Sequence, residues 1–106
     1  MRLLFDQGTP VPLRSHLFAH TVSTAFELDW ASLTNGELLS RAESDGFDAL
    51  VATDQNLKYQ QNRSERHLAI AVLLTTSWPR IERHVATVCA QIDALQPGSY
   101  VEIVVP

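Results

Sequence analysis

Two unbroken apolar runs place the strongest constraint on how this chain can fold. They cover residues 49–52 and 68–74, and each is followed at once by polar residues. Apolar runs without alternation are typical of parallel strands that are covered on both faces. The sequence therefore predicts an α/β fold in which these two segments are buried strands.

The rest of the chain alternates between strand and helix patterns. Strands are expected at residues 2–5, 21–25, 47–53, 68–74 and 100–105. Helical segments and short turns separate them, so we expect right-handed crossovers and a mainly parallel five-stranded sheet with helices on both faces. This is a three-layer α/β/α arrangement. A strand order of 2-1-3-4-5 would place the first and third strands side by side at a topological switch point.

Capping and periodicity signals locate the helices. Thr9 is the expected N-cap of a first helix that begins at Pro10, and Thr34 opens a second helix. The apolar side of the first helix consists of Val11, Leu13, Leu17 and Phe18. One continuous last helix is expected to begin at Pro79, and its apolar stripe consists of Ile81, Val85, Val88, Ile92 and Leu95. The polar residues 57–67 predict a short helix or an ordered loop.

Composition limits the class of protein. A chain of 106 residues with 45% hydrophobic content predicts one domain, residues 1–106, with its own core. The net charge of −4 argues against a surface that coats polyanions in general, so any nucleic-acid contact would be local. Cys89 is the single cysteine and provides neither a disulfide framework nor a Cys-based zinc site. No apolar run approaches about 20 residues, so we expect a soluble, cytoplasmic protein with no membrane partner.

Three carboxylates are expected at one edge of the sheet. Asp6 and Asp54 follow the first and third strands, and Glu37 lies in the first turn of the second helix. Three carboxylates that are close together repel one another unless a cation joins them, and a hard ion such as Mg²⁺ prefers oxygen ligands. Such an ion activates water and stabilises charge on a phosphate. The pattern therefore predicts metal-assisted hydrolysis of phosphodiesters.

Each acid also has a purely structural interpretation. Asp6 could cap the next helix, and Glu37 could form a capping box with Thr34. Asp54 could cap the segment that follows it or brace a turn through Asn56. For Thr53, a role in orienting Asp54 is favoured over a chemical role.

The stretches LLFDQGTP at residues 3–10 and NGELLSRAESDGFDALVATDQN at residues 35–56 resemble the small PIN-like domains. The resemblance is to the compact branch that is often found as predicted ribonuclease toxins of toxin–antitoxin systems. It implies a PIN-like fold, RNA cleavage with one or two Mg²⁺ or Mn²⁺ ions, and an antitoxin partner. It also implies that Asp6 and Asp54 are catalytic metal ligands and that Glu37 is the helical acid of the site.

The chain departs from the pattern of that family at two positions. Asn56 stands where members often have a further acid, and Gln7 stands where many have Glu. These amides could still hold a metal-bound water or a phosphate. Asn35, at the start of the second helix, is a further supporting candidate.

The polar segment after Asp54 is the candidate RNA contact surface. The residues expected to take this role are Lys58, Tyr59, Arg63 and Arg66. Their cations would contact phosphates, and the tyrosine ring would stack on a base. A solvated helix face explains the same residues without RNA.

Other classes of function share features with this sequence. A non-catalytic PIN-like protein would bind RNA or an antitoxin-like partner without cleavage, and Asn56 supports this alternative. A phosphoacceptor receiver domain also has an Asp after its third strand, but it needs a second acid beside Asp6 and a Lys after its fifth strand, and this chain has neither. The apolar last strand and the helix containing Ile81 would suit a homodimer, although a monomer core uses the same residues.

Overall fold

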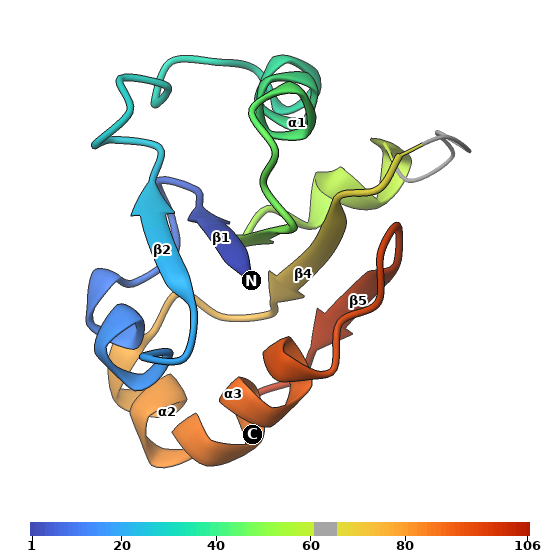
Figure 1. The fold of residues 1–106 in the computed structure, drawn as a ribbon. Helices are drawn as coiled ribbons and strands as arrows, with labels where there is room; N and C mark the ends of the chain where they lie inside the picture. The colour runs from blue at the N-terminus through green and yellow to red at the C-terminus, as the bar shows by residue number, and fades with distance from the viewer. Residues whose placement is uncertain (61–65) are drawn as a thin grey trace.

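The computed structural model describes residues 1–60 and 66–106. Their strands form one five-stranded sheet (Figure 1). All neighbouring strands are parallel, and their order is β2-β1-β3-β4-β5. The strands are β1 (Arg2–Phe5), β2 (Thr21–Thr24), β3 (Ala49–Ala52), β4 (Ala69–Leu73) and β5 (Tyr100–Ile103). The helices are η1 (Val11–His16) and η2 (Gln55–Gln60), both 3₁₀, and α1 (Asn35–Ser44), α2 (Trp78–Arg83) and α3 (Val85–Asp93). The predicted α/β class and strand order are confirmed.

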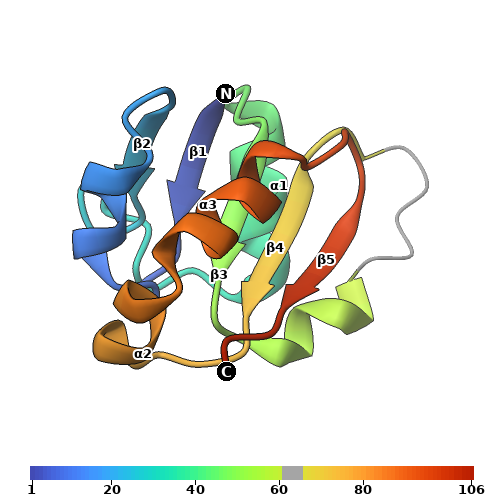
Figure 2. The ribbon, with the colours of Figure 1, turned by 90° about the horizontal axis from the view of Figure 1, so that it is seen from below.

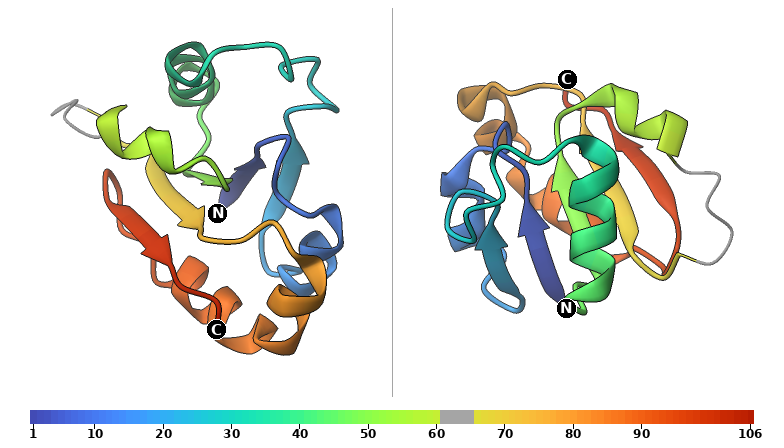
Figure 3. Two further views of the ribbon diagram at one scale, coloured as in Figure 1. Left: turned by 180° about the vertical axis from the view of Figure 1, so that it is seen from behind. Right: turned by 90° about the horizontal axis from the view of Figure 1, so that it is seen from above.

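Helices cover both faces of the sheet and give three layers (Figures 2 and 3). On one face, Leu3 and Phe5 of β1 share a core with residues of η1, α2 and α3. On the other face, Leu4 belongs to the core that contains residues of α1 and η2. Alternate residues of a strand point to opposite sides, so β1 is buried on both faces. Within the described ranges, no helix has the length and apolar character needed to cross a membrane.

The connection between β4 and β5 has an unusual hand. The chain moves in one direction along the sheet from β1 to β2 and in the opposite direction from β4 to β5, yet η1, α2 and α3 all cover the same face. The two crossovers therefore have opposite hands, and Figure 2 shows that the β4–β5 crossover is left-handed. About 98% of such connections are right-handed, and the prediction of right-handed crossovers is wrong for this unit. On this face α2 and α3 can pack against η1 as well as against the sheet.

The first helix differs from the prediction in geometry and in burial. η1 is a 3₁₀ helix, and its N-cap residue, Pro10, makes no side-chain cap hydrogen bond. Leu13 is fully buried, whereas Val11 and Phe18 are 53% and 91% exposed. A helix with three residues per turn does not keep the apolar residues of an α-helical pattern on one side, and Phe18 lies beyond the end of η1 at His16. The predicted apolar side is therefore only partly buried.

The last helix is interrupted at His84. α2 ends at Arg83 and α3 begins at Val85, where the sequence predicts one continuous helix. His84 leaves helical geometry, with φ −123° and ψ 25°. Apolar spacings of three and four continue across this residue, because both helices bury the same side, so the pattern does not reveal the break. The bend lets both α2 and α3 contact η1.

Candidate functional site

The ends of β1 and β3 meet at the carboxyl edge of the sheet, where the chain carries Asp6 and Asp54. The strands pair with Phe5 opposite Val51, and the backbone N–H of Asp6 donates to the Val51 carbonyl at 3.1 Å. The Asp6 carboxylate accepts a hydrogen bond from the backbone N–H of Thr53 at 3.3 Å. The predicted adjacency of these two strand ends is confirmed.

The Asp6 carboxylate holds the turn that leaves β1. Its Oδ1 accepts from the backbone N–H of Thr9 at 3.0 Å and from the Thr9 hydroxyl at 2.7 Å. The Thr9 hydroxyl oxygen also lies 2.8 Å from the Val51 carbonyl oxygen, and Thr9 is 3% exposed. Thr9 is thus a buried link between β1 and β3, and the prediction that it caps the following helix is wrong. These contacts also support a structural role for Asp6.

Gly8 allows the same turn to pass close to β3. A Cβ atom at position 8 would lie 2.2 Å from the Thr53 Oγ1 atom and 3.8 Å from the Asp6 Oδ1 atom. Because no real Cβ atom approaches an oxygen so closely, a side chain at position 8 would displace Thr53. The sequence predicts that Thr53 orients Asp54, whereas in the structure its backbone N–H donates to Asp6.

Burial dominates the electrostatics of Asp6. Removal from water raises the pKa of the Asp6 carboxyl group above its ordinary value of 3.8. Hydrogen bonds from the Thr9 hydroxyl and from the backbone of Thr53, Thr9 and Gly8 act in the opposite direction but do not cancel the effect of burial. A partly dehydrated carboxylate gains more from a bound cation than an exposed one does.

The raised pKa of Asp6 predicts a pH dependence of stability. The stability contributed by protonated Asp6 is complete below pH 3.8 and is lost as the pH rises through the higher pKa of the folded state. Asp6→Asn lacks this titration. We therefore expect the free energy of unfolding of the wild type to fall relative to that of Asp6→Asn as the pH rises through this window. Urea unfolding of both proteins without metal, at half-unit steps from pH 3 to pH 7, measures it, and a constant difference contradicts it.

Asp54 is oriented by two partners. Its Oδ2 accepts from the Asn35 side-chain amide at 3.0 Å, and its Oδ1 accepts from the backbone N–H of Asn56 at 2.9 Å. Asn35 is the first residue of α1, so this contact ties the start of the helix to the end of β3. The interpretation of Asp54 as a brace for the turn at Asn56 is supported, and Asn35 takes a more central place than the sequence indicates.

Glu37 is engaged in the N-cap of α1. Its Oε1 accepts from the backbone N–H of Thr34 at 2.9 Å, and the Thr34 hydroxyl accepts from the Glu37 N–H at 3.3 Å. The backbone hydrogen bond from Thr34 is the largest cause that lowers the pKa of Glu37. Within residues 1–60 and 66–106, no three acidic, histidine or cysteine side chains form a group suited to one ion. The geometry therefore supports the capping role of Glu37. The carboxylates that remain at this edge of the sheet are those of Asp6 and Asp54.

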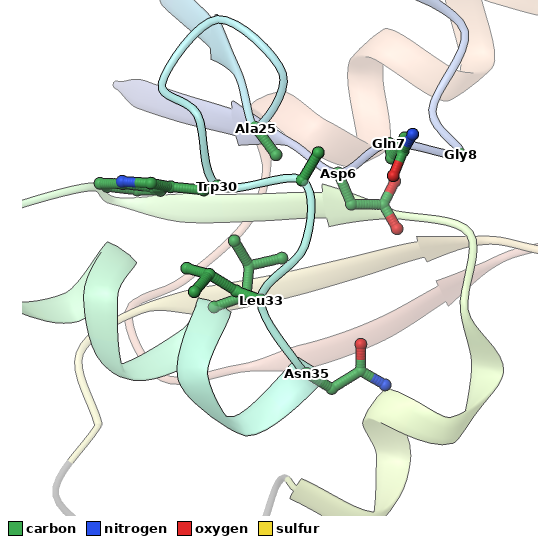
Figure 4. A pocket seen from close by; sticks show the side chains of 9 residues that line it. Asp6, Gln7, Gly8, Ala25, Trp30, Leu33 and Asn35 are labelled. Atoms are coloured by element: carbon green, nitrogen blue, oxygen red, sulfur yellow. The ribbon is translucent and has the colours of Figure 1, made fainter.

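A small pocket of about 120 Å³ opens beside Asp6 (Figure 4). Polar residues from the turn after β1 and from the start of α1 form one side of it, namely Asp6, Gln7 and Asn35, together with Gly8. Apolar residues form the other side, namely Ala25, Trp30, Ala31, Leu33 and Leu38. Most of the apolar side comes from the loop between β2 and α1, so the pocket joins this loop to the carboxyl edge of the sheet.

The candidate RNA-binding residues follow Asp54 in and after η2. Tyr59 is 70% exposed, and the Lys58 Nζ atom lies 5.2 Å from the centre of its ring. Arg66 donates to the backbone carbonyls of Gln60 at 2.8 Å and Leu68 at 3.2 Å, so its guanidinium group takes part in the local structure. Arg63 lies outside the described residues.

Asp6 and Asp54 offer carboxylate oxygens, the kind of donor atom that a hard divalent ion prefers. A carboxylate oxygen has two lone pairs. The two hydrogen bonds from Thr9 occupy both on Asp6 Oδ1, whereas those from Thr53, Asn35 and Asn56 use one each on Asp6 Oδ2, Asp54 Oδ2 and Asp54 Oδ1. Mg²⁺ is often bound by one or two carboxylates together with water and substrate phosphate. The chemistry of these two carboxylates is therefore compatible with Mg²⁺ or Mn²⁺.

The fold and this edge define an α/β domain with two carboxylates where strands β1 and β3 leave the sheet. Protein-family models, curated proteins and solved structures were compared with the chain, and none of them matches it.

Proposed function

We propose that this chain is an endoribonuclease of the PIN-like type that depends on Mg²⁺ or Mn²⁺. The observation that carries the proposal is the meeting of Asp6 and Asp54 at neighbouring strand ends, beside a pocket. Ligands of open α/β sheets bind at the carboxyl ends of the strands. The resemblance of residues 3–10 and 35–56 to PIN-like domains supplies the reaction class.

The residues of the site have separate roles in this proposal. Asp6 and Asp54 hold the ion, and Asn35 and Asn56 donate to Asp54 and keep its carboxylate in place. When bound, the ion supplies an activated water and stabilises charge on the phosphate. Glu37 maintains the start of α1, from which Asn35 reaches Asp54.

The exposed ring of Tyr59 supports a single-stranded substrate. Bases of single strands stack on aromatic side chains, whereas bases inside a duplex do not reach them. Lys58 lies beside this ring and can contact a phosphate. An antitoxin-like partner and a homodimer remain predictions from the sequence.

The substitution Asn35→Asp tests where the ion binds. It replaces the amide that donates to Asp54 at 3.0 Å by a third carboxylate. Without metal the two carboxylates repel, so we expect the free energy of unfolding to fall by about 1–2 kcal/mol. With metal they share the ion, so we expect Mn²⁺ affinity to rise on the order of tenfold. Calorimetric Mn²⁺ titration and urea unfolding measure the two effects.

Asn56→Asp is the matched control, because it adds the same charge at a residue whose contact to Asp54 runs through the backbone N–H. We expect its gain in Mn²⁺ affinity to be smaller. Equal affinities in the wild type and both variants would show that the ion does not bind at Asp54. In the same samples, RNA that binds but stays uncut with Mg²⁺ or Mn²⁺ would favour the non-catalytic alternative.

A further inference from the structure

The pocket beside Asp6 has the size of a single aromatic ring. Its volume is about 120 Å³, whereas a cavity of about 150 Å³ holds one benzene molecule and a water takes about 30 Å³. The pocket is therefore comparable in size with one six-membered ring and smaller than a fused two-ring system. The apolar wall, with Trp30 and Leu33, suits an uncharged ring better than a sugar (Figure 4).

Without a bound cation, the polar side of the pocket repels anions, and it offers the hydrogen-bond acceptors of Asp6 and Asn35 beside the Gln7 amide, which can donate or accept. The Asp6 carboxylate would repel a phosphate group that entered without a cation. The Asn35 amide nitrogen donates one hydrogen bond to Asp54, and its carbonyl oxygen is an acceptor available on this side of the pocket. In Figure 4 this oxygen points towards the side of the pocket where Asp6 lies. An uncharged ring that carries an amino group matches these acceptors.

We propose that this pocket receives one pyrimidine base of the RNA strand and prefers cytosine over uracil. Cytosine presents an exocyclic amino donor where uracil presents a carbonyl acceptor. Single-stranded RNA is commonly read by bases that are turned out of the stack and hydrogen-bonded at their edges. The inference rests on the proposed function, because it assumes that an RNA strand lies along this edge of the sheet.

Free nucleosides test the pocket without any cleavage. We expect cytidine to shift the NMR signals of the Gln7 and Asn35 side-chain amides and of the Leu33 methyl groups, with a dissociation constant on the order of 1 mM. Uridine should bind several-fold more weakly, and adenosine and guanosine should leave these signals in place. Equal shifts with all four nucleosides, or no shift with cytidine, would overturn the assignment.

The substitution Ala31→Leu fills the pocket without removing a polar group. Ala31 lines the pocket and is half-buried, whereas Ala86 on α3 is exposed and far from it in the fold, so Ala86→Leu is the matched control. We expect Ala31→Leu to weaken cytidine binding at least about tenfold and Ala86→Leu to leave it unchanged. Unchanged binding in Ala31→Leu would overturn the assignment.

Cleavage mapping on an RNA of mixed sequence separates this inference from the proposed function. If the wild type cuts beside cytosine and Ala31→Leu cuts without base preference, the result supports both the base pocket and the nuclease. Cuts without base preference, together with no cytidine binding, overturn the base pocket and leave the nuclease. Cytidine binding by a protein that cuts no RNA supports the pocket and contradicts the nuclease.

Discussion

Asp54→Asn is expected to lower metal-dependent RNA cleavage by at least about a hundredfold, since loss of a mere partner of a metal ligand already costs 10–100-fold. The fold should survive the change. The new amide oxygen can accept from the Asn56 N–H, and Asn35 can rotate its own amide to present an acceptor. We therefore expect the free energy of unfolding to change by no more than about 1 kcal/mol. A fluorescent single-stranded RNA in Mg²⁺ and a urea titration measure the two quantities.

Two further variants make this result specific. Glu82→Gln removes the same charge from an exposed position on α2 and should cleave as the wild type does. Glu37→Gln keeps the capping box, because a glutamine can accept from the Thr34 N–H. It should also retain cleavage if Glu37 acts only as a cap. A loss in Glu37→Gln as large as that in Asp54→Asn would instead make Glu37 a ligand, and full activity of Asp54→Asn would contradict the proposed site.

Trp30→Ala is expected to lower the free energy of unfolding by about 3–5 kcal/mol. Trp30 is 8% exposed, and its ring packs edge-on against Phe47 with 6.0 Å between ring centres. The Arg41 guanidinium carbon lies 5.3 Å from the indole centre. The backbone N–H of Trp30 donates to Ala25 at 2.8 Å, so the residue anchors the loop between β2 and α1. The variant should therefore also lose the pocket beside Asp6.

Trp78→Ala is the matched control for that loss. Trp78 packs on the other face of the sheet, where its ring centre lies 5.7 Å from that of His16. The chain has two tryptophans, so each variant keeps one fluorescent reporter for urea unfolding. Both proteins should be less stable than the wild type, but cytidine binding should disappear in Trp30→Ala alone. A decrease in stability below about 1 kcal/mol in Trp30→Ala would show that the loop is held by other contacts.

Local sequence patterns predict the sheet well, because a parallel strand buried on both faces has a composition that few other structures share. β3 and β4 lie within the two apolar runs, and β5 is an edge strand with Glu102 exposed. The hand of the β4–β5 connection is not predictable in this way. It depends on the contact between the last two helices and η1, which are far apart in the sequence.

The candidate site is predictable in position but less so in the roles of its residues. Strand order alone brings Asp6 and Asp54 to one edge. The capping box at Thr34 was equally visible in the sequence, yet only the structure shows that Glu37 is engaged in it. The role of Thr9 is not predictable from its neighbours, because a Thr before a Pro is an ordinary helix start. Its contact with Val51 joins residues 42 positions apart.

The left-handed β4–β5 connection also bears on how this fold is compared with others. Substitutions and small insertions can lengthen a helix or shift a strand, but they cannot carry α2 and α3 from one side of the sheet to the other, because the chain would have to be threaded anew between β4 and β5. A protein with the same strand order and a right-handed last connection therefore has a different chain topology. A comparison of folds must include the side of the sheet on which the last helices run.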